Sequence, residues 1–357
     1  MVASTDSGDA STRRLPTMAD VAREAGVSST TVSFVINNRV DQSISAQTRR
    51  RVLEVVEALG YRPNRAARNL QAQRTATIGY LSNERADNPF SGQSIAGAHD
   101  SAWKHGTALL VVNTTRDTER LLAGINDLLD RRVDAILFAA VGTRRVILPG
   151  LLSNVPTVLV NCYLPDGSLP CALPDDEGGG YAATRLLLDA GHREIAYLAG
   201  RPGAWATRAR LRGYRRALTE HGLDPKQQIV RFGNYMADSG YDLTREVLAG
   251  PVLPTALLCG NDRMALGAYL ALGEAGLRVP QDMSVVGYDD QPTLAGEVHP
   301  RLSTVRLPYY RMGWWAAEQL LSHQVGRLPP QTLIAAEVVP RDSVAAPRAS
   351  TPPPTSG

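Results

Sequence analysis

The sequence predicts a small all-α domain containing a helix-turn-helix, followed by an α/β body of two doubly wound parallel-sheet lobes. Three observations support this fold class. Near the N-terminus, two short helical segments are joined at a glycine. Beyond residue 75, short apolar runs alternate with amphipathic helical stretches, which is typical of βαβ units. The 357 residues are enough for two or three domains with buried cores.

The small domain shows start and stop signals for three helices. Thr17 is followed three positions later by Asp20, a pattern similar to a capping box with Asp in place of the usual Glu. Gly26 is expected to end this first helix, and Ser28 to cap a second that runs to about Asn38. A third helix is expected from about Ser45 to Leu59.

The second helix has two distinct sides when it is projected at about 100° per residue. Val32, Val35 and Ile36 fall together, and Thr30, Ser33, Phe34 and Asn37 lie opposite. A recognition helix presents such an outer face to base edges in the major groove. Phe34 on this face predicts apolar contact with thymine methyl groups, and packing on a neighbouring segment is the alternative.

Positive charge is concentrated in the first 75 residues. They hold eleven arginines against seven acidic residues, a net +4 in a chain of net +3, so the remainder is near −1. A compact positive module suggests a polyanionic partner for the small domain only. On charge alone, a solvated basic face explains the pattern equally well.

Four segments resemble the LacI/GalR family of bacterial repressors, and in order and spacing the match continues through nearly the entire chain. They are 17–22, 25–28, 31–33 and 61–70. The resemblance implies a transcriptional regulator, most simply a repressor, with a periplasmic-binding-protein-like body. It also implies a homodimer on double-stranded operator DNA and a small-molecule effector, a sugar or related polar metabolite, bound between the lobes. Whether the effector induces or co-represses is left open.

The resemblance assigns DNA binding to residues of the helix-turn-helix and of the segment that follows it. The candidates are Thr17, Ser28, Ser29, Thr30, Thr31, Ser33, Phe34, Asn37, Asn64, Arg65, Ala67 and Leu70. In the family, residues matching Ser29, Thr30 and Phe34 read bases, and the last of these is often Arg. Phe34 therefore lacks a guanine-reading fork that is worth about 1–3 kcal/mol of discrimination. The operator sequence cannot be transferred from relatives.

Residues 63–75 are interpreted as a hinge helix and linker. Two helical turns opened by Pro63 are too short to persist alone in water. The resemblance implies that this helix folds on DNA and that Leu70 wedges into the minor groove, unstacking a base step. The alternative is that Leu70 packs on the body as a linker residue.

The body, residues 76–344, contains two series of four strand-like runs. They lie at 78–81, 109–112, 135–138 and 158–160, and at 195–198, 229–230, 256–259 and 284–287. Each series fits one doubly wound lobe, with a ligand held near the carboxyl ends of the strands. The chain is expected to cross between lobes near Pro174, at 299–303 and near Leu328.

The candidate effector-binding residues are Phe90, Ser91, Asn161, Arg210, Tyr235 and Asp262. Asn161 directly follows a predicted strand, Asp262 comes three residues after one at the start of a helix, and Arg210 lies in the family's Arg-x-x-Gly-aromatic pattern. The resemblance implies that Phe90 and Tyr235 stack on a ligand. Each has an ordinary structural alternative: Asp262 caps its helix, Arg210 bridges to an acid, and the aromatic rings simply pack. Asn161 stands where sugar-responsive members often have Asp, and Ser91 replaces a second aromatic, so the effector is not identified.

Other function classes lack their sequence signatures. The chain shows no GxSxG, HExxH or phosphate-loop motif, so no catalytic residue, cofactor or metal is predicted. Three cysteines without CxxC spacing are interpreted as packing residues. Neither a signal peptide nor a membrane-length apolar run is recognised, which predicts a cytoplasmic, nucleoid-associated protein. Residues 1–15 and 345–357 are expected to be disordered tails. A DNA-tethered enzyme acting on a sugar or nucleoside is the alternative function, and a secreted solute-binding protein is a third.

Overall fold

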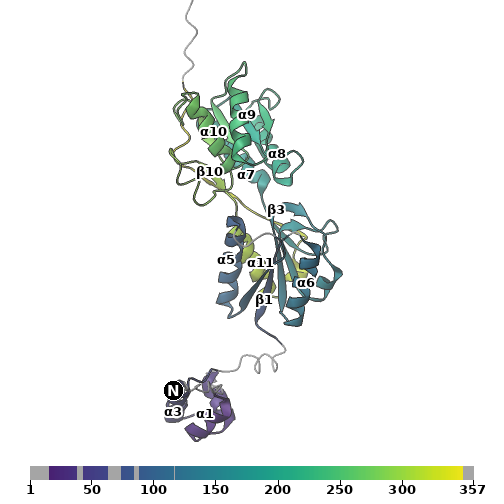
Figure 1. Cartoon of the computed structure of the whole chain (residues 1–357), viewed down its shortest axis with the longest axis vertical. Coiled ribbons are helices and arrows are strands. Elements are labelled where there is room, and N and C mark those ends of the chain that lie inside the picture. The colour runs from purple at the N-terminus through teal and green to yellow at the C-terminus, as the bar shows by residue number, and fades with distance from the viewer. Residues whose placement is uncertain (1–15, 38–42, 63–73, 84–87, 116, 349–357) are drawn as a thin grey trace, which may run out of the picture. The chain divides into compact units, whose positions relative to one another are not determined.

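The computed structural model describes residues 16–37, 43–62, 74–83, 88–115 and 117–348 (Figure 1). Its internal contacts divide the chain into two units, Met1–Thr75 and Ala76–Gly357, and each has its own apolar core. The predicted hinge residues 63–73, the tail 1–15 and residues 349–357 lie outside the described residues. No helix in the described part of the chain is long and apolar enough to span a membrane.

The first unit contains the three predicted helices: α1 (Met18–Ala25), α2 (Ser29–Ile36) and α3 (Ala46–Leu59). The capping box at the start of α1 is confirmed, because Thr17 N–H donates to the Asp20 carboxylate at 2.9 Å and the Asp20 N–H donates to Thr17 Oγ1 at 3.3 Å. The Thr17 hydroxyl group also donates to the Asp20 carboxylate at 2.6 Å, and this bond, together with that from the Thr17 N–H, lowers the pKa of Asp20 to about 2. Gly26 and Gly60 end α1 and α3 in the left-handed conformation, with φ of 63° and 61°.

The core of this unit is small and is shared by all three helices. Val21, Val32 and Val52, one from each helix, are each 0% exposed, and Tyr61 closes the cluster after α3. The predicted inward side of α2 is confirmed by Val32 and Val35, which are buried. Helices of eight residues are unstable alone, so this packing holds α1 and α2 in place.

The second unit contains two lobes, each with a parallel sheet. Lobe 1 has the strand order β11-β5-β4-β3-β1-β2. Its strands are β1 (Thr77–Ser82), β2 (Ala108–Asn113), β3 (Ala135–Arg145), β4 (Thr157–Tyr163), β5 (Cys171–Pro174) and β11 (Gln331–Ile334), and its helices are α5 (Pro89–Lys104), α6 (Thr118–Asp130), η1 (Gly150–Asn154), α11 (Tyr309–Leu321) and η2 (Val325–Arg327). Helices α5 and α11 cover one face of this sheet and α6 the other (Figure 1).

Lobe 2 has the strand order β7-β6-β8-β9, again all parallel. Its strands are β6 (Ile195–Ala199), β7 (Val230–Phe232), β8 (Ala256–Cys259) and β9 (Ser284–Val286), and its helices are α7 (Asp176–Asp189), α8 (Trp205–Glu220), α9 (Ala237–Leu248) and α10 (Asp262–Glu274). Helices α7 and α8 pack on one face, and α9 and α10 on the other. The doubly wound prediction is therefore confirmed for both lobes.

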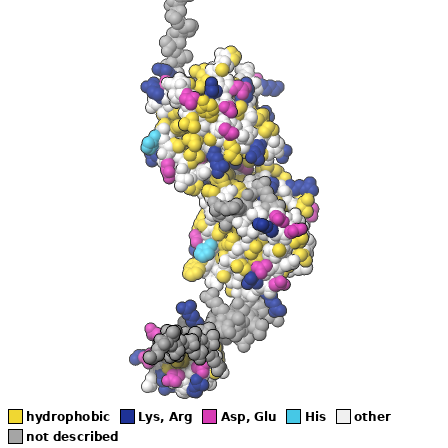
Figure 2. All heavy atoms as spheres, viewed as in Figure 1, with side chains coloured by type: hydrophobic (Ala, Val, Ile, Leu, Met, Phe, Trp, Pro, Cys, Tyr) yellow, Lys and Arg dark blue, Asp and Glu magenta, His cyan; other side chains and the backbone are white. Residues whose placement is uncertain are grey.

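Side chains of both charges are interspersed with apolar ones on the face shown in Figure 2.

The eight predicted strands are all present, but lobe 1 has two more. β5 and β11 are four-residue strands that pair with each other in parallel at the sheet edge. The crossing at Pro174 is confirmed, since β5 belongs to lobe 1 and α7 to lobe 2. The second crossing is β10 (Thr304–Arg306), just beyond the predicted segment. The third crossing, expected near Leu328, is instead β12 (Glu337–Val339). The chain stays in lobe 1 past Leu328, because β11 adds a strand to the lobe 1 sheet.

The C-terminal segment stays on lobe 2 beyond the predicted end of the body at residue 344. Ala345 O accepts a hydrogen bond from the His192 ring at 2.9 Å, and Arg348 forms an ion pair with Asp282 at 2.9 Å. Residues 345–348 are therefore part of the folded body, which corrects the expectation of a tail from residue 345. The polar and Pro-containing composition of this segment did not reveal these specific contacts.

Glycines allow α7 and α8 to approach closely, and this contact places the first turns of both helices near the ends of the strands. A Cβ added at Gly213 of α8 would overlap the carbonyl oxygen of Glu177 and the N–H of Tyr181. A Cβ added at Gly180 of α7 would overlap the backbone of Arg210. The two backbones are thus in direct contact, and neither can move aside as a flexible side chain could.

Gly213→Ala is expected to lower the free energy of unfolding by about 1–3 kcal/mol, because the added methyl group overpacks a backbone contact. Urea titration followed by circular dichroism measures this change. Gly273→Ala in α10 is the control, because no atom lies within 4 Å of its added Cβ. Alanine there should be neutral or stabilising by up to about 1 kcal/mol. Equal stability of the two variants would contradict the close approach.

Candidate DNA interface and effector site

The outer face of α2 carries the candidate base-reading residues. Ser29 and Thr30 are exposed in its first turn, and Phe34 is half-buried one turn later. Among the described residues, Phe34 does not join the apolar cluster that holds Val32 and Val35. Within the part of the chain that the structure describes, the Phe34 ring thus lies apart from the core of this unit.

The other candidates in the helix-turn-helix make local hydrogen bonds. The hydroxyl groups of Ser28 and Thr31 lie 2.9 Å apart, and the N–H of Thr31 donates to Ser28 Oγ at 3.1 Å, which is the predicted N-cap. Asn37 Nδ2 donates to the carbonyl oxygen of Ser33 at 2.9 Å. Thr17 is engaged in its capping box. The candidates Asn64, Arg65, Ala67 and Leu70 lie outside the described residues.

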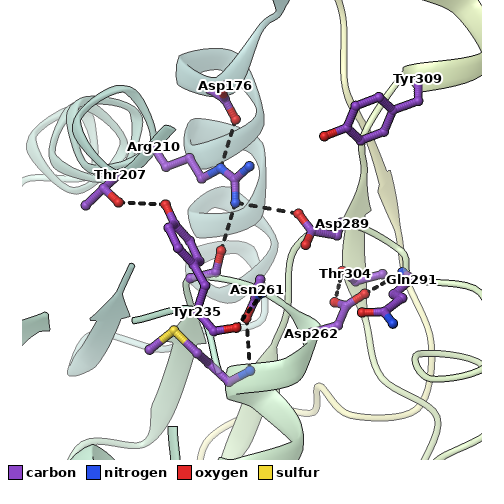
Figure 3. Close-up of polar contacts among 12 residues, drawn as sticks. Asp176, Thr207, Arg210, Tyr235, Asn261, Asp262, Asp289, Gln291, Thr304 and Tyr309 are labelled. Carbon is purple, nitrogen blue, oxygen red and sulfur yellow. Dashed lines mark hydrogen bonds and ion pairs between the residues drawn. The ribbon is translucent and has the colours of Figure 1, made fainter. Parts of the chain in front are cut away.

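In lobe 2, Arg210 lies at the centre of a buried polar cluster (Figure 3). Its Nε donates to the Asp176 carboxylate at 2.8 Å, and its Nη1 donates to Gly260 O at 2.8 Å and lies 3.7 Å from Asp289. The guanidinium carbon is 3.5 Å from the centre of the Tyr288 ring. Arg210, Asp176, Tyr288 and Asp289 are called the Arg210 cluster below. The structural alternative for Arg210, an ion pair with a neighbouring acid, is therefore present, and the acid is Asp176.

The two acids of the Arg210 cluster differ in access. Asp176 is buried, and its Oδ2 has no hydrogen-bond partner among the described residues. The side chain of Asp289 keeps 11% of its surface exposed. Burial raises the pKa of Asp289 to about 7, although Arg210 opposes the rise. Asp289 is therefore the acid of the cluster that can accept a hydrogen bond from a ligand.

Asp262 lies beneath the site, although the sequence led us to expect its carboxylate to face a ligand. It is 0% exposed, and its two oxygens accept hydrogen bonds from the Thr304 hydroxyl and the Gln291 N–H, both at 2.6 Å (Figure 3). The helix cap is its neighbour Asn261, whose side chain accepts from Met264 N. Asp262 thus connects α10 to β10 and to the loop after β9.

The lobe 1 candidates gather around Tyr309, the first residue of α11. The ring of Phe90 stacks on Tyr309 with centroids 5.2 Å apart. Asn161 Nδ2 donates to the Tyr309 hydroxyl at 3.3 Å, and Asn161 Oδ1 accepts from Thr143 at 2.6 Å. The hydroxyl end of Tyr309 points toward the Arg210 cluster (Figure 3). Ser91 is buried, and its Oγ has no partner among the described residues.

Tyr235 is held on the lobe 2 side. Its hydroxyl group lies 2.6 Å from Thr207 Oγ1, and its carbonyl oxygen accepts from Asn261 Nδ2 at 3.1 Å. A Cβ at Gly200 would overlap the Tyr235 ring, so the ring covers the end of β6. Each lobe thus contributes a tyrosine whose hydroxyl group is hydrogen-bonded within the protein, Tyr309 in lobe 1 and Tyr235 in lobe 2.

Sequence reasoning missed Asp176, Asp289 and Tyr309. Asp289 could have been found, because Tyr288-Asp289-Asp290 follows the predicted strand 284–287, the same signal that selected Asp262. Asp176 opens the helix after the Pro174 crossing and had a weaker signal. Tyr309 has none, since it reaches the site only because β10 returns the chain to lobe 1.

Comparison with known proteins places this geometry in a family. Residues 17–64 match the model for bacterial regulatory proteins of the lacI family, and residues 184–344 match that for a periplasmic binding protein-like domain. The ribose operon repressor of Escherichia coli (strain K12) is 36% identical over 310 residues, which cover 86% of this chain and 92% of that protein. The chain belongs to the lacI family of bacterial regulatory proteins. It is a transcriptional regulator and not an enzyme.

Two further relatives extend the match over the whole length. The HTH-type transcriptional repressor PurR of Vibrio cholerae is 35% identical over 334 residues, 92% of this chain and 98% of that protein. The crystal structure of the lac repressor dimer bound to operator and the anti-inducer ONPF superimposes with a TM-score of 0.74 at 29% identity, covering 93% of this chain and 100% of that chain. The LacI-family regulator therefore shares both parts of its fold with these proteins.

Asp262→Asn is expected to reduce the pH dependence of unfolding. Burial raises the pKa of Asp262 to about 8, so the folded regulator holds it protonated where the unfolded chain ionises it. The resulting stability is complete in acid and is lost as pH rises from about 4 to about 8, by at most about 1.4 kcal/mol per pH unit. Asn cannot ionise, so the variant should lose less stability over this range.

Urea titrations at about pH 5 and about pH 8 measure this difference. The exposed Asp224 provides the control substitution, Asp224→Asn. If Asp262→Asn and wild type lost equal stability between the two pH values, Asp262 would have to be ionised in the folded state.

Proposed function

We propose that this LacI-family regulator is a cytoplasmic, nucleoid-associated homodimer that represses transcription and responds to a small polar metabolite. The observation that carries the proposal is that one chain has both an outward polar face on α2 and a polar cluster at the strand ends of the second unit. The first fits base edges and the second fits a hydroxyl-bearing ligand. The operator-bound lac repressor is a dimer, which supports two α2 helices on two half-sites.

The proposal divides the chain by role. Residues 16–62 bind DNA, residues 63–75 form the hinge and linker, and the body from residue 76 to Arg348 binds the effector and dimerises. Ser29, Thr30 and Phe34 contact bases. The remaining DNA-binding candidates, named above, contact the sugar-phosphate backbone of the DNA or position α2. Leu70 is proposed as the wedge at the operator centre.

Phe34 is expected to contact a thymine methyl group in each half-site. An operator selected from random DNA should be an inverted repeat, as a symmetric dimer requires. Replacing the contacted thymine by deoxyuracil removes one methyl group, worth about 0.8 kcal/mol or about fourfold in wild-type affinity. Phe34→Ala should bind both DNAs equally, whereas Asn37→Ala should keep the difference.

Fluorescence anisotropy titration measures these affinities. A Phe34→Ala variant that still loses affinity on deoxyuracil DNA would place the methyl contact elsewhere. A selected site without inverted symmetry would contradict binding as a symmetric dimer.

The effector is proposed to be a sugar, with D-ribose as the first candidate. Asp289 and Arg210 supply an acceptor and a donor for vicinal hydroxyl groups, and Phe90 and Tyr235 supply apolar faces for a ring. The similarity to the ribose operon repressor supports this class.

A panel of D-ribose, other pentoses, hexoses and purine bases tests the effector class by thermal shift and calorimetry. At about pH 8, above the pKa of Asp289 of about 7, the sugar that binds should lose about tenfold or more in affinity with Asp289→Asn, since a neutral amide replaces a charged hydrogen-bond acceptor. Glu119→Gln, an exposed change on α6, is the control. A purine as the only ligand would overturn the sugar assignment, and unchanged affinity in Asp289→Asn would remove Asp289 from the site.

A further inference from the structure

The loop after β9 holds two consecutive non-glycine residues in backbone conformations that L-residues rarely adopt. Asp289 has φ of 110° and Asp290 has φ of 52°. Such conformations cost free energy and persist only where surrounding contacts enforce them. The contacts that hold Asp289 and Asp290 in these conformations come from the two segments that cross between the lobes, β10 and the end of the β12 crossing.

The carboxylate of Asp290 is held by one arginine from each crossing. Arg306 of β10 donates from Nε at 2.8 Å, and Arg341, two residues after β12, donates from Nη2 at 2.6 Å. Arg341 also donates from Nη1 to Leu302 O at 2.8 Å. The side chain of Asp290 is 10% exposed and that of Arg341 18%, so the ion pair between these two is weakly screened, whereas Arg306 is 52% exposed. Asp290, Arg306 and Arg341 are called the crossing clamp.

The neighbouring residue Asp289 has a different role. Its side chain lies 3.7 Å from Arg210 in the candidate effector site. Its backbone nevertheless belongs to the crossing, since Asp289 N donates to Val305 O at 2.8 Å and Leu307 N donates to Asp289 O at 3.4 Å. Two adjacent acids on one strained loop therefore contact different partners, one at the effector site and one on the strands that join the lobes.

We infer that Asp290 is a positioning residue that makes the effector loop and both crossing strands move as one body. A ligand that shifts Asp289 then shifts β10, and with it Tyr309 at the start of α11 in lobe 1. The regulatory part of this inference rests on the proposed function. The mechanical part concerns the ligand-free chain and can be tested without any effector.

Hydrogen exchange of the ligand-free regulator tests the mechanical part. Asp290→Asn should speed exchange at the N–H groups of Asp289, Leu307 and Arg341 by about tenfold or more, because the clamp no longer holds these backbones together. Asp289→Asn is the matched control in the same loop, and it should leave the N–H groups of Leu307 and Arg341 within about twofold of wild type. Arg306→Gln removes only one ion pair of a half-exposed arginine and serves if Asp290→Asn does not fold.

Two results would overturn the clamp. One is unchanged exchange in both Asp290→Asn and Arg306→Gln. The other is equal acceleration at Leu307 and Arg341 in Asp289→Asn, which would show general loosening of the loop.

Operator affinity with and without saturating D-ribose tests the regulatory part. Effectors typically change a coupled affinity by about 5–150-fold. Asp290→Asn should bring this ratio close to one while the Kd for D-ribose stays within about threefold of wild type, a split that simple destabilisation would not produce. Asp289→Asn should raise the Kd for D-ribose instead. If Asp290→Asn kept the wild-type ratio of operator affinities with and without D-ribose, the regulatory role would be overturned. If operator affinity of the wild type does not respond to D-ribose, D-ribose fails as the effector, and hydrogen exchange alone decides the clamp.

Discussion

Burial of the Arg210 guanidinium is the constraint around which the second unit is organised. A buried cation must have acceptors close by, because the cost of removing it from water is otherwise large. Arg210 takes them from three places: Asp176 at the start of α7, Gly260 after β8, and Asp289 after β9. The glycine contact between α7 and α8 sets the first of these distances. The carboxyl ends of the parallel strands bring the other two to the same edge.

Acidic side chains outnumber Arg210 at this edge, and their environments separate their roles. Asp176 is bound to Arg210, Asp262 is bound to Thr304 and Gln291, and Asp289 keeps an exposed edge. Burial raises the pKa of all three. A raised pKa favours the protonated carboxyl group, which can donate a hydrogen bond to a hydroxyl-bearing ligand as well as accept one. Asp176 and Asp262 hold α7, α8 and β10 together, and the proposed role of Asp289 is to contact the ligand.

Much of the fold could be predicted from the sequence because its signals are local. The capping box at Thr17, the stop at Gly26 and the inward Val32 each depend on residues within one or two helical turns. The eight predicted strands of the body are short apolar runs between polar segments. β5 and β11 were not predicted because each is only four residues long and each is defined by pairing with a strand distant in sequence, β11 with β5 and β5 also with β4. The candidate site was partly predicted for the same reason: Arg210, Asn161 and Asp262 follow local patterns, but the partners that define their roles do not.

The sequence by itself determined the two-part organisation, the helix-turn-helix with Phe34 on its outer side, and the family to which the regulator belongs. These depend on spacing along the chain, which periodicity and motif order record directly. Only the tertiary structure decided that Asp262 lies beneath the site, that Asp289 faces it, and that Asp290 joins the effector loop to both crossings. Those roles depend on Thr304, Arg306 and Arg341, which lie 16 to 51 residues from the acids that they bind. Local sequence carries no information about which way two adjacent acids point once the backbone between them is left-handed.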